Sequence, residues 1–410
     1  MEIGHSEISL RKSIIPIILL ISLLFYNIIF FENNDWLGDY TYHYILIFTS
    51  IVATSIGLSE KIKISFVIKK IFSSIKSIST PIIILLLVGA LAGTWKVSGI
   101  IPAMVYYGLN LVDPAVFLPL TLVVSTLVSL TTGSSYTTSA TVGIALVAVG
   151  VAFNIPYGMT AGAVISGAYF GDKMSPLSDT TNLAPAVAGT DLFTHINHMI
   201  WTTGPSLLIA LCIFLFMGFN AVDTQNLEGL DLIQSTIVNN FNISILSFVP
   251  LLTVFIMAFK KMPAFPTVLI GALLGGIFAI ALQPNIVSNF VGNTNLPNYL
   301  ISISGVWTAL HSGFFIESGV EVVDDLLSRG GMSSMLNTVW LVISALTFGA
   351  VLETTKLLNT LVKILLSFAK STSSLIITTI GTCIGINIVT ADQYMAIVLP
   401  GSCLLYTSDA

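Results

Sequence analysis

The sequence predicts an all-α polytopic membrane protein with about eleven transmembrane helices, inverted repeats and discontinuous helices. Of its 410 residues, 55% are hydrophobic and 9% are charged, whereas about 25% of the residues of a soluble domain are charged. Backbone polar groups in a bilayer must be hydrogen-bonded within the protein, so apolar runs of about 17–25 residues indicate membrane-spanning helices. Polar clusters interrupt some of these runs and predict breaks in the helices.

The composition also excludes several classes of protein. The low charge content excludes a soluble globular enzyme, and the high hydrophobicity excludes a disordered chain. Fifteen basic and 20 acidic residues give a net charge of −5, without the basic excess that a nucleic-acid-binding protein needs. Cys212, Cys383 and Cys403 have no metal-ligand spacing, so we expect reduced thiols and no bound cofactor.

Apolar runs along the chain give the expected spans. The clear runs cover residues 13–31, 42–58, 81–97, 114–130, 199–219, 243–259, 264–283, 338–352 and 374–400. Residues 157–170 and 300–316 are weaker candidates. Arg11 and Lys12 precede the first run as in a secretory signal, but no small-residue cleavage site follows, so we expect a retained span.

Basic residues in the short connections predict the orientation. Residues 61–76 contain five lysines, whereas residues 32–39 contain three acidic residues and neither Lys nor Arg. Because basic connections favour the cytoplasm, residues 1–12 are expected to form a cytoplasmic N-terminus of a multi-pass protein in the cell membrane. Residues 61–77 are also amphipathic, which predicts a segment lying on the lipid headgroups.

An offset of about 257 residues aligns the chain with itself and predicts two inverted repeats. Residues 13–31 then align with residues 270–288. The aligned connections differ in charge, since residues 60–77 are basic and residues 317–334 are acidic, as an inverted copy requires. We therefore expect a first transmembrane repeat at 13–198, linking helices at 199–263, and a second repeat at 264–401.

The second repeat is expected to be incomplete. The chain ends shortly after the polar break at residues 389–394, whereas the first copy continues well past its own break. Residues 402–410 match nothing in the first copy, so they are expected to be a non-native tail on a C-terminally truncated chain.

The first polar cluster is "SLTTGSSYTTSATVG" at residues 129–143. Its hydroxyls and glycines predict a broken helix that presents backbone carbonyls, together with Thr132, Ser134 and Ser135, as oxygen ligands for a small cation. The alternative is that these small residues only let helices pack closely.

A second cluster, "GAYFGDKMSPLSDTTNLAPAVAGTD", covers residues 167–191. Its glycines and prolines predict non-helical backbone inside the membrane, where several oxygen donors gather. A solvated loop is the alternative. The donors are Asp172, Asp179, Thr180, Thr181 and Asn182.

The third cluster, "GINIVTADQYMAIVLPG", contains Thr390 and Asp392 within an apolar run. An intramembrane carboxylate indicates a functional site. A helix that begins at Asp392 after a break is the alternative, and it is compatible with the same function. Glu353 lies three residues before Lys356, which predicts an exposed ion pair within one helix.

Three motifs resemble those of the NhaC sodium/proton antiporter family, which is related to the sodium-lactate/proton-malate antiporters. The motifs are "GAYFGDKMSPLSDTTNLAPAVAGTDLFTHI", "LLSRGGMSSML" and "TADQYMAIVLPG". The resemblance implies a non-enzymatic secondary transporter of the ion-transporter superfamily that exchanges Na⁺ for H⁺ by alternating access. By motif, Asp172, Asp179 and Asn182 belong to the family's first conserved segment, and Thr390 and Asp392 belong to its last.

Exchange requires sodium and a proton to compete for one carboxyl group. An ordinary aspartate, with a pKa of about 3.9, is almost never protonated near neutral pH. Burial in a bilayer can raise a carboxyl pKa by about 3–5 units and bring both ions into competition. We therefore expect one of the three aspartates, Asp172, Asp179 or Asp392, to alternate between a sodium-bound carboxylate and a neutral acid.

Other functions stay open at this point. An organic-acid-coupled antiporter of the Na⁺-lactate/H⁺-malate type is the main alternative, and an ion channel or an intramembrane hydrolase is remote. The sequence offers neither a nucleophile with its base nor a three-ligand metal site for a hydrolase. The expected partners are sodium, protons, small carboxylates, the lipid bilayer and a second copy in a homodimer, with no nucleic acid.

Overall fold

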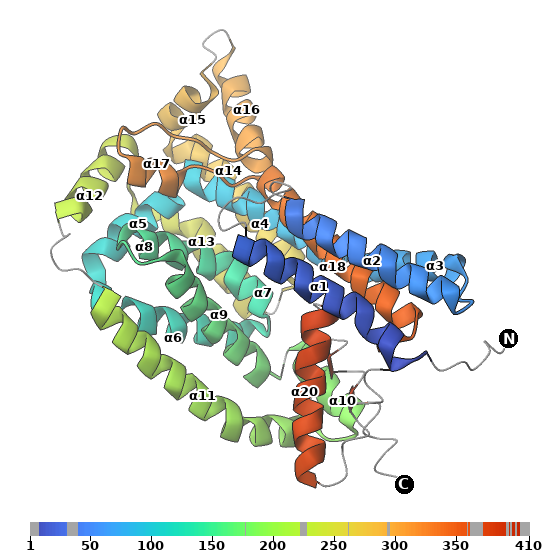
Figure 1. The fold of residues 1–410 in the computed structure, drawn as a ribbon. Helices are drawn as coiled ribbons and strands as arrows, with labels where there is room; N and C mark the ends of the chain where they lie inside the picture. Colours follow the sequence, from blue (N-terminus) through green and yellow to red (C-terminus); the bar gives the residue numbers. More distant parts are fainter. Residues whose placement is uncertain are drawn as a thin grey trace. The chain divides into compact units, whose positions relative to one another are not determined.

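The computed structural model describes residues 8–30, 40–176, 178–221, 228–260, 262–292, 296–358, 360, 372–390, 393, 396–397 and 400–401. They form helices and the connections between them (Figure 1). The chain divides into two compact units. The first unit is Met1–Ile82, Leu183–Gly189 and Asn337–Ala410, and the second unit is Ile83–Asn182 and Thr190–Leu336.

The first unit is built around three long apolar helices. It contains α1 (Leu10–Phe30), α2 (Thr41–Ser59), α3 (Ile64–Ser77), almost all of α18 (Leu336–Thr354), and α20 (Thr372–Thr390). Helices α1 and α2 pack side by side (Figure 1). Leu20, Ile45, Ala53, Phe348 and Leu352 are buried together in its core. This core joins α1, α2 and α18 although α18 is far away in the sequence.

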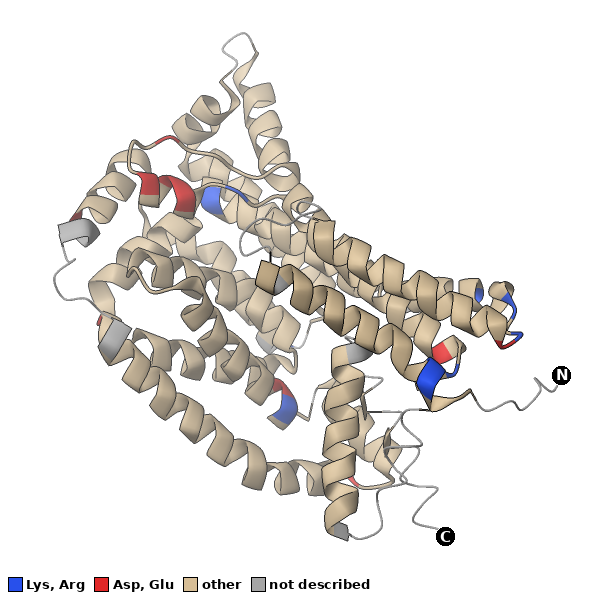
Figure 2. Ribbon diagram, viewed as in Figure 1, with Lys and Arg blue, Asp and Glu red and all other residues tan. Residues whose placement is uncertain are grey.

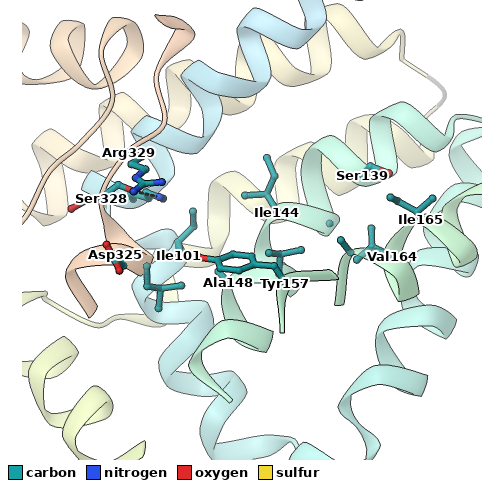
Figure 3. A pocket seen from close by; sticks show the side chains of 15 residues that line it. Ile101, Ser139, Ile144, Ala148, Tyr157, Val164, Ile165, Asp325, Ser328 and Arg329 are labelled. Atoms are coloured by element: carbon teal, nitrogen blue, oxygen red, sulfur yellow. Dashed lines mark hydrogen bonds between the residues drawn. The ribbon is translucent and has the colours of Figure 1, made fainter. Parts of the chain in front are cut away.

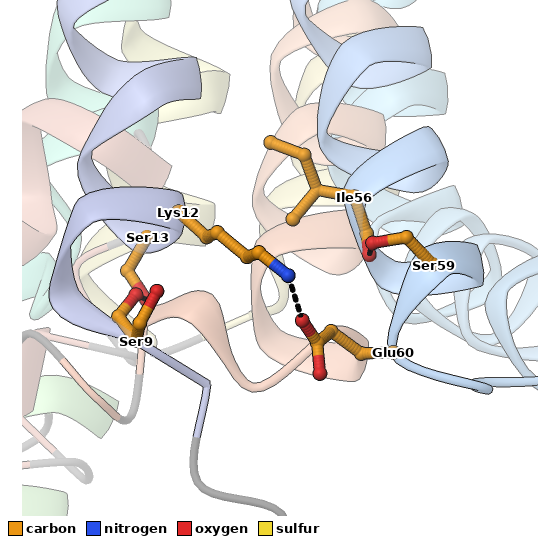
Figure 4. A network of polar contacts seen from close by, with 6 residues as sticks. All are labelled: Ser9, Lys12, Ser13, Ile56, Ser59 and Glu60. Atoms are coloured by element: carbon orange, nitrogen blue, oxygen red, sulfur yellow. Dashed lines mark hydrogen bonds and ion pairs between the residues drawn. The ribbon is translucent and has the colours of Figure 1, made fainter.

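Two ion pairs join helices within the first unit. The ammonium group of Lys12 at the start of α1 lies 2.5 Å from the Glu60 carboxylate that follows α2 (Figure 4). Lys70 of α3 lies 2.6 Å from Glu353 of α18. The predicted pairing of Glu353 with Lys356 is therefore wrong, because α3 supplies the cation instead. The predicted amphipathic segment at 61–77 forms the helix α3.

The second unit holds the remaining helices. They are α4 (Ser79–Val97), α5 (Ile100–Leu111), α6 (Pro114–Thr132), α7 (Ser135–Thr138), the π-helical turn η2 (Ser139–Gly143), α8 (Ile144–Ala152), α9 (Tyr157–Met174), the start of α10 (Asp179–Ala188), α11 (Leu192–Ala221), α12 (Glu228–Asn240), the 3₁₀ turn η4 (Ile245–Phe248), α13 (Val249–Phe259), α14 (Ala264–Leu282), α15 (Pro284–Val291), α16 (Asn298–His311), α17 (Glu321–Leu327) and the 3₁₀ turn η5 (Met332–Met335). Trp95, Phe117 and Phe314 are among its fully buried side chains.

Eight of the described helical segments are long and apolar enough to cross a membrane. The number is nine if the bent pair of helices α12 and α13 is counted as one further span. The two helices of that pair meet at 92°. The prediction of an all-α polytopic membrane protein is confirmed. One weaker span is wrong in extent, because α16 ends at His311 and the chain from 312 to 320 is not helical.

Side-chain placement in the spans agrees with a lipid environment. Figure 2 shows Lys, Arg, Asp and Glu near the ends of the candidate spans rather than at their middles. Large apolar side chains of α11, such as Leu208, Ile213 and Phe216, are exposed, and only 6% of this span is buried inside the protein. So large an apolar surface is unfavourable in water, and we expect lipid to cover it. Cys212 and Cys383 are free thiols, and Cys403 lies outside the described residues.

Helix boundaries recur at the spacing that the predicted repeat requires. Helices α2 and α16 begin 257 residues apart, as do α3 and α17. Helices α4 and α18 both begin and end 257 residues apart, and each has 19 residues. These boundaries agree with two copies of one helical unit, and the inverted repeat and its limits at 13–198 and 264–401 stay predictions.

Candidate functional site

The helix that begins at Pro114 is interrupted, as the first polar cluster predicts. The carboxylate of Asp113 accepts a hydrogen bond from the Ala115 N–H at 2.9 Å and caps the start of α6. The helix ends at Gly133, whose φ of 65° lies in the left-handed region that glycine adopts readily. The chain resumes as α7 after Ser134, whose hydroxyl accepts a hydrogen bond from the Thr137 N–H at 3.2 Å.

Irregular backbone continues on the far side of this break. Residues Ser139–Gly143 form the π-helical turn η2 before α8 begins. Single π-helical turns inside α-helices occur frequently at functional sites. The break therefore combines two irregular backbone conformations, the left-handed residue Gly133 and the widened π-helical turn η2.

Glycines bring α9 against α6 at the level of the break. Any side chain at Gly171 would place its Cβ 2.5 Å from the Thr126 carbonyl oxygen and 2.6 Å from the Leu130 nitrogen. Gly167, one turn earlier, also faces the α6 backbone. Such glycine spacing allows membrane helices to approach closely. Ser129 then donates a hydrogen bond from its hydroxyl to the Ala168 carbonyl at 2.5 Å.

This close packing places the carboxylate of Asp172 beside the break. Asp172 lies in the last turn of α9 and is only 5% exposed. Its Oδ2 atom accepts a hydrogen bond from the Ser135 hydroxyl at 2.8 Å. Its Oδ1 atom is buried and has no hydrogen-bond partner among the described residues. Of the two carboxylate oxygens, only Oδ2 is thus held by a described residue, Ser135 of α7.

The backbone around Asp172 is held by the following segment. The Thr181 hydroxyl of α10 lies within hydrogen-bond distance of the carbonyl oxygens of Asp172, at 3.2 Å, and Lys173, at 3.1 Å. Lys173 itself is exposed. Within the described residues, Asp172 forms no ion pair, so no protein cation neutralises it there.

The predicted ligands separate into distinct groups. Asp172 and Ser135 are brought into contact, and Thr132 and Ser134 lie at the break, where the Thr132 hydroxyl is 3.4 Å from that of Thr138. The amide of Asn182 is exposed and donates hydrogen bonds to the carbonyls of Pro176 and Ser178, at 2.9 and 2.6 Å. Asn182 therefore stabilises the α9–α10 connection rather than contacting the Asp172 carboxylate.

Of the remaining predicted ligands, only Thr180 has a described side chain. The Thr180 hydroxyl is 3.1 Å from that of Ser178. Asp179 begins α10 and Thr390 ends α20, and the side chains of both lie outside the described residues. Asp392 also lies outside them. Whether any predicted residue binds sodium stays a prediction.

One expectation about the second cluster is wrong. The donors were expected on non-helical backbone, but Asp172 lies within α9 and Asp179 begins α10, so the chain between the helices is only residues 175–178. Gly171 does not break α9, which continues to Met174. Its role is instead to let α9 approach the α6 backbone, because it has no side chain. Pro185 lies inside α10, which continues to Ala188.

Sequence reasoning missed a row of hydroxyls on α6. Thr121, Ser125 and Ser129 follow one another at four-residue spacing, and all three are fully buried. The hydroxyls of Thr121 and Ser125 have no partner among the described residues. Spacing by four marks one face of a helix, so the pattern could have identified this polar face.

The described residues contain no group of three or more His, Cys, Asp or Glu side chains that could hold a metal ion. The site instead offers one carboxylate and several hydroxyl oxygens. Carboxylate, carbonyl and hydroxyl oxygens suit hard cations better than they suit zinc or copper. The arrangement could therefore bind a small, weakly held cation or a proton.

Comparison with known proteins identifies the family of the chain. Residues 167–405 match the model of the Na⁺/H⁺ antiporter family. The chain is 39% identical over 321 residues to the Na⁺/H⁺ antiporter NhaC of Alkalihalophilus pseudofirmus, an alignment that covers 78% of the chain and 66% of the relative. No solved structure matches the chain significantly.

Two proteins of Bacillus subtilis match almost equally. The Na⁺/H⁺ antiporter NhaC is 34% identical over 334 residues, covering 81% of the chain and 70% of the relative. The malate-2H⁺/Na⁺-lactate antiporter is 33% identical over 319 residues, covering 78% of the chain and 65% of the relative. The chain thus spans about two-thirds of the length of these relatives. The resemblance seen in the motifs is confirmed, and the chain belongs to the Na⁺/H⁺ antiporter family.

Proposed function

We propose that this protein exchanges Na⁺ for H⁺ across a membrane, with Asp172 as the group for which the two ions compete. The observation that carries the proposal is the buried Oδ1 atom of Asp172, which has no partner among the described residues. A buried carboxylate without a cation is costly. Either of the two proposed ions would remove that cost, sodium by binding and the proton by neutralising the charge.

The surroundings of Asp172 suit both states. The Ser135 hydroxyl donates to Oδ2, which supports the ionised state in which sodium is bound. Sodium would take its remaining ligands from oxygens at the break near Thr132 and Ser134. In the other state, a proton on Oδ1 would leave a neutral acid that is cheaper to hold in an apolar site. One ion must leave before the other binds, and this competition couples the two fluxes.

The decisive measurement is sodium-dependent proton flux in proteoliposomes that contain the purified protein. We expect the wild type to alkalinise the lumen when sodium is added outside and to acidify it when sodium is loaded inside. Asp172→Asn should reduce this flux to the background of empty vesicles. Asp113→Asn is the matched control, because it changes an exposed aspartate on the neighbouring helix and retains a capping oxygen. The control should exchange like the wild type.

Two results would contradict the proposal. If Asp172→Asn exchanges at the wild-type rate, Asp172 is not the coupling group. If sodium gradients drive large currents that are not matched by proton movement, the protein conducts ions as a channel. Saturation of the flux with sodium is expected for an exchanger.

We also propose that the N-terminus is cytoplasmic and that the protein lies in the cell membrane. The lysines at and around α3 support this orientation, and exposed Phe66 and Phe72 suit contact with lipid. In a variant whose native cysteines are replaced by serine, Lys63→Cys should resist a membrane-impermeant maleimide applied to intact cells, whereas Asn34→Cys should react. The reverse pattern would overturn the orientation. Carboxylate co-substrates and a homodimer stay predictions from the sequence.

A further inference from the structure

The second unit contains a cavity of about 380 Å³ that Asp172 does not line. Lys96 is one of its polar lining residues. Figure 3 shows the polar residues Arg329, Asp325 and Tyr157 and the apolar residue Ile144 at this cavity. A few charged groups beside apolar walls are typical of sites for small organic molecules.

Close backbone packing brings the two cationic residues of this cavity together. Lys96 lies in the last turn of α4, and its ammonium group donates a hydrogen bond to the Ser328 carbonyl. Arg329 follows Ser328 directly. The next two residues are glycines, and the N–H of Gly331 donates to the carbonyl of Gly89 on α4 at 2.7 Å. The connection that carries Arg329 is therefore fastened to the helix that carries Lys96.

Arg329 is held in an unfavourable backbone conformation. Its φ is +74°, in the left-handed region that costs a residue with a side chain about 1–2 kcal/mol. The Phe314 N–H donates to the Arg329 carbonyl at 3.4 Å and fixes the turn from its other side. Strained residues of this kind persist where the surrounding structure imposes them, often at binding sites. The Arg329 side chain is exposed and lines the cavity.

Lys96 is partly buried and Arg329 is exposed, and the two cations repel each other. Lys96 and Arg329 interact unfavourably through their like charges. Neither forms an ion pair with a carboxylate in the part of the chain that the structure describes. Asp325 also lines the cavity, so these three charged groups sum to one positive charge. A single negative charge would balance them.

We propose that this cavity binds a small monocarboxylic acid, with its carboxylate between Lys96 and Arg329 and its carbon chain along Ile101, Ile144 and Val164. A guanidinium group can donate two parallel hydrogen bonds to a carboxylate, which a simple inorganic ion such as chloride does not match. The apolar wall would cover the carbon chain of the acid. The hydroxyls of Ser139 and Tyr157, which also line the cavity, are available to a polar substituent.

The position of Ser139 links the cavity to the cation site. Ser139 lies four residues after Ser135, which binds Asp172, so both sites share the short α7–η2 segment. The monocarboxylate would then be a second transported species. This part of the inference rests on the proposed exchange function, whereas binding itself can be measured without any transport.

Isothermal titration calorimetry of the purified protein with butyrate tests the assignment. The buffer contains chloride and no sodium, so that butyrate must compete with an inorganic anion. Butyrate should bind, and butyramide, which has nearly the same shape without the charge, should not. Succinate should bind more weakly than butyrate, because its second charge has no partner in the cavity.

Substitutions at the two cations complete the test. Lys96→Gln and Arg329→Asn should each weaken butyrate binding by about tenfold or more, because each leaves the carboxylate short of one cation. Asparagine is chosen at 329 because it tolerates a positive φ. Lys260→Gln is the matched control, since Lys260 is an exposed residue of the same unit outside the cavity, and it should bind butyrate like the wild type.

The outcomes separate this proposal from the exchange proposal. Equal binding of butyramide and butyrate, or unchanged affinity in both Lys96→Gln and Arg329→Asn, would overturn the monocarboxylate site. Asp172→Asn should bind butyrate with wild-type affinity in sodium-free buffer even though it loses exchange. If exchange survives in Asp172→Asn while butyrate binds as expected, only the exchange proposal fails.

Discussion

Four charged groups of the first unit form ion pairs, whereas three charged groups at the candidate sites of the second unit do not. In the first unit, Lys12 pairs with Glu60 and Lys70 pairs with Glu353. In the second unit, Asp172, Lys96 and Arg329 form no ion pair with any described residue. The paired charges join neighbouring helices, whereas these three unpaired charges lie at a helix break or a cavity.

This difference separates structural charges from functional ones. A charge placed in a membrane helix costs about 2.5–3.5 kcal/mol on insertion scales, and a partner on the protein recovers part of that cost. Where the protein supplies no partner, a transported ion or molecule can do so, and binding becomes favourable for that reason. Burial without an ion pair, as at Asp172, is therefore a better guide to the sites of this protein than charge itself, because exposed charges such as Lys173 and Asp113 also lack ion pairs with described residues.

The largest effect on stability is expected where α9 positions the unpaired carboxylate. Gly171→Ala should lower the free energy of unfolding by about 1–3 kcal/mol, because the new Cβ meets the α6 backbone, which cannot move aside easily. Gly158→Ala on the same helix is the matched control. Its Cβ meets nothing within 4 Å, so it should gain up to about 1 kcal/mol from helix propensity. Equal effects on denaturant unfolding would show that the α6–α9 contact is not tight.

A smaller effect is expected from sodium on thermal stability. Sodium at about ten times its dissociation constant should stabilise the wild type by about 1.4 kcal/mol relative to choline, and this increment should vanish in Asp172→Asn. Without sodium, Asp172→Asn should be at least as stable as the wild type, because it removes a buried charge and keeps an acceptor for Ser135. A sodium-dependent rise in melting temperature that persists in Asp172→Asn would place sodium elsewhere.

The sequence could predict the helices and the break because these depend on neighbouring residues. Apolar run length predicts α1, α2, α4 and α6, and the glycine and hydroxyls after Thr132 predict the interruption at Gly133. These signals act within one turn or one span of the chain. Local patterns also predict the amphipathic helix α3.

Contacts between distant segments could not be predicted in the same way. Ser135 and Asp172 are 37 residues apart, and Lys70 and Glu353 are 283 residues apart. Nearness in sequence favoured Lys356 as the partner of Glu353, but tertiary packing brings α3 closer. Asp172 is one of three candidate aspartates in the sequence, and its contact with Ser135 depends on the packing of Gly171 against α6. The cationic cavity likewise depends on the packing of Gly331 against α4.

The paired charges of the first unit should contribute little to stability. Lys70→Gln and Glu353→Gln should each lower the free energy of unfolding by about 0.5 kcal/mol, and their double-mutant coupling should be of the same size. The side chains are 37% and 30% exposed, so salt should weaken the coupling. Exchange should be unchanged in both variants. Loss of exchange in either variant would show that paired charges also act in transport, which contradicts the distinction drawn between the units.

The smallest effect is expected at Asp191, a charge that its own helix satisfies. Its carboxylate accepts hydrogen bonds from the Thr194 N–H at 3.0 Å and the Thr194 hydroxyl at 3.2 Å. These bonds, the backbone one foremost, lower the pKa of Asp191. A lowered pKa means that the stabilisation is present above the unfolded-state value of about 3.9 and disappears as the pH falls through the folded-state value.

Asp191→Asn tests this pH dependence, because asparagine keeps the capping oxygen without the charge. The wild type should melt slightly higher than the variant at neutral pH, where the carboxylate also interacts favourably with the N-terminus of α11. The difference should shrink to zero as the pH falls below 4. A difference that stays constant down to acid pH would mean that the charge contributes nothing. Because Asp191 already has partners in the protein, its substitution should leave sodium binding unchanged, in contrast to substitution of Asp172.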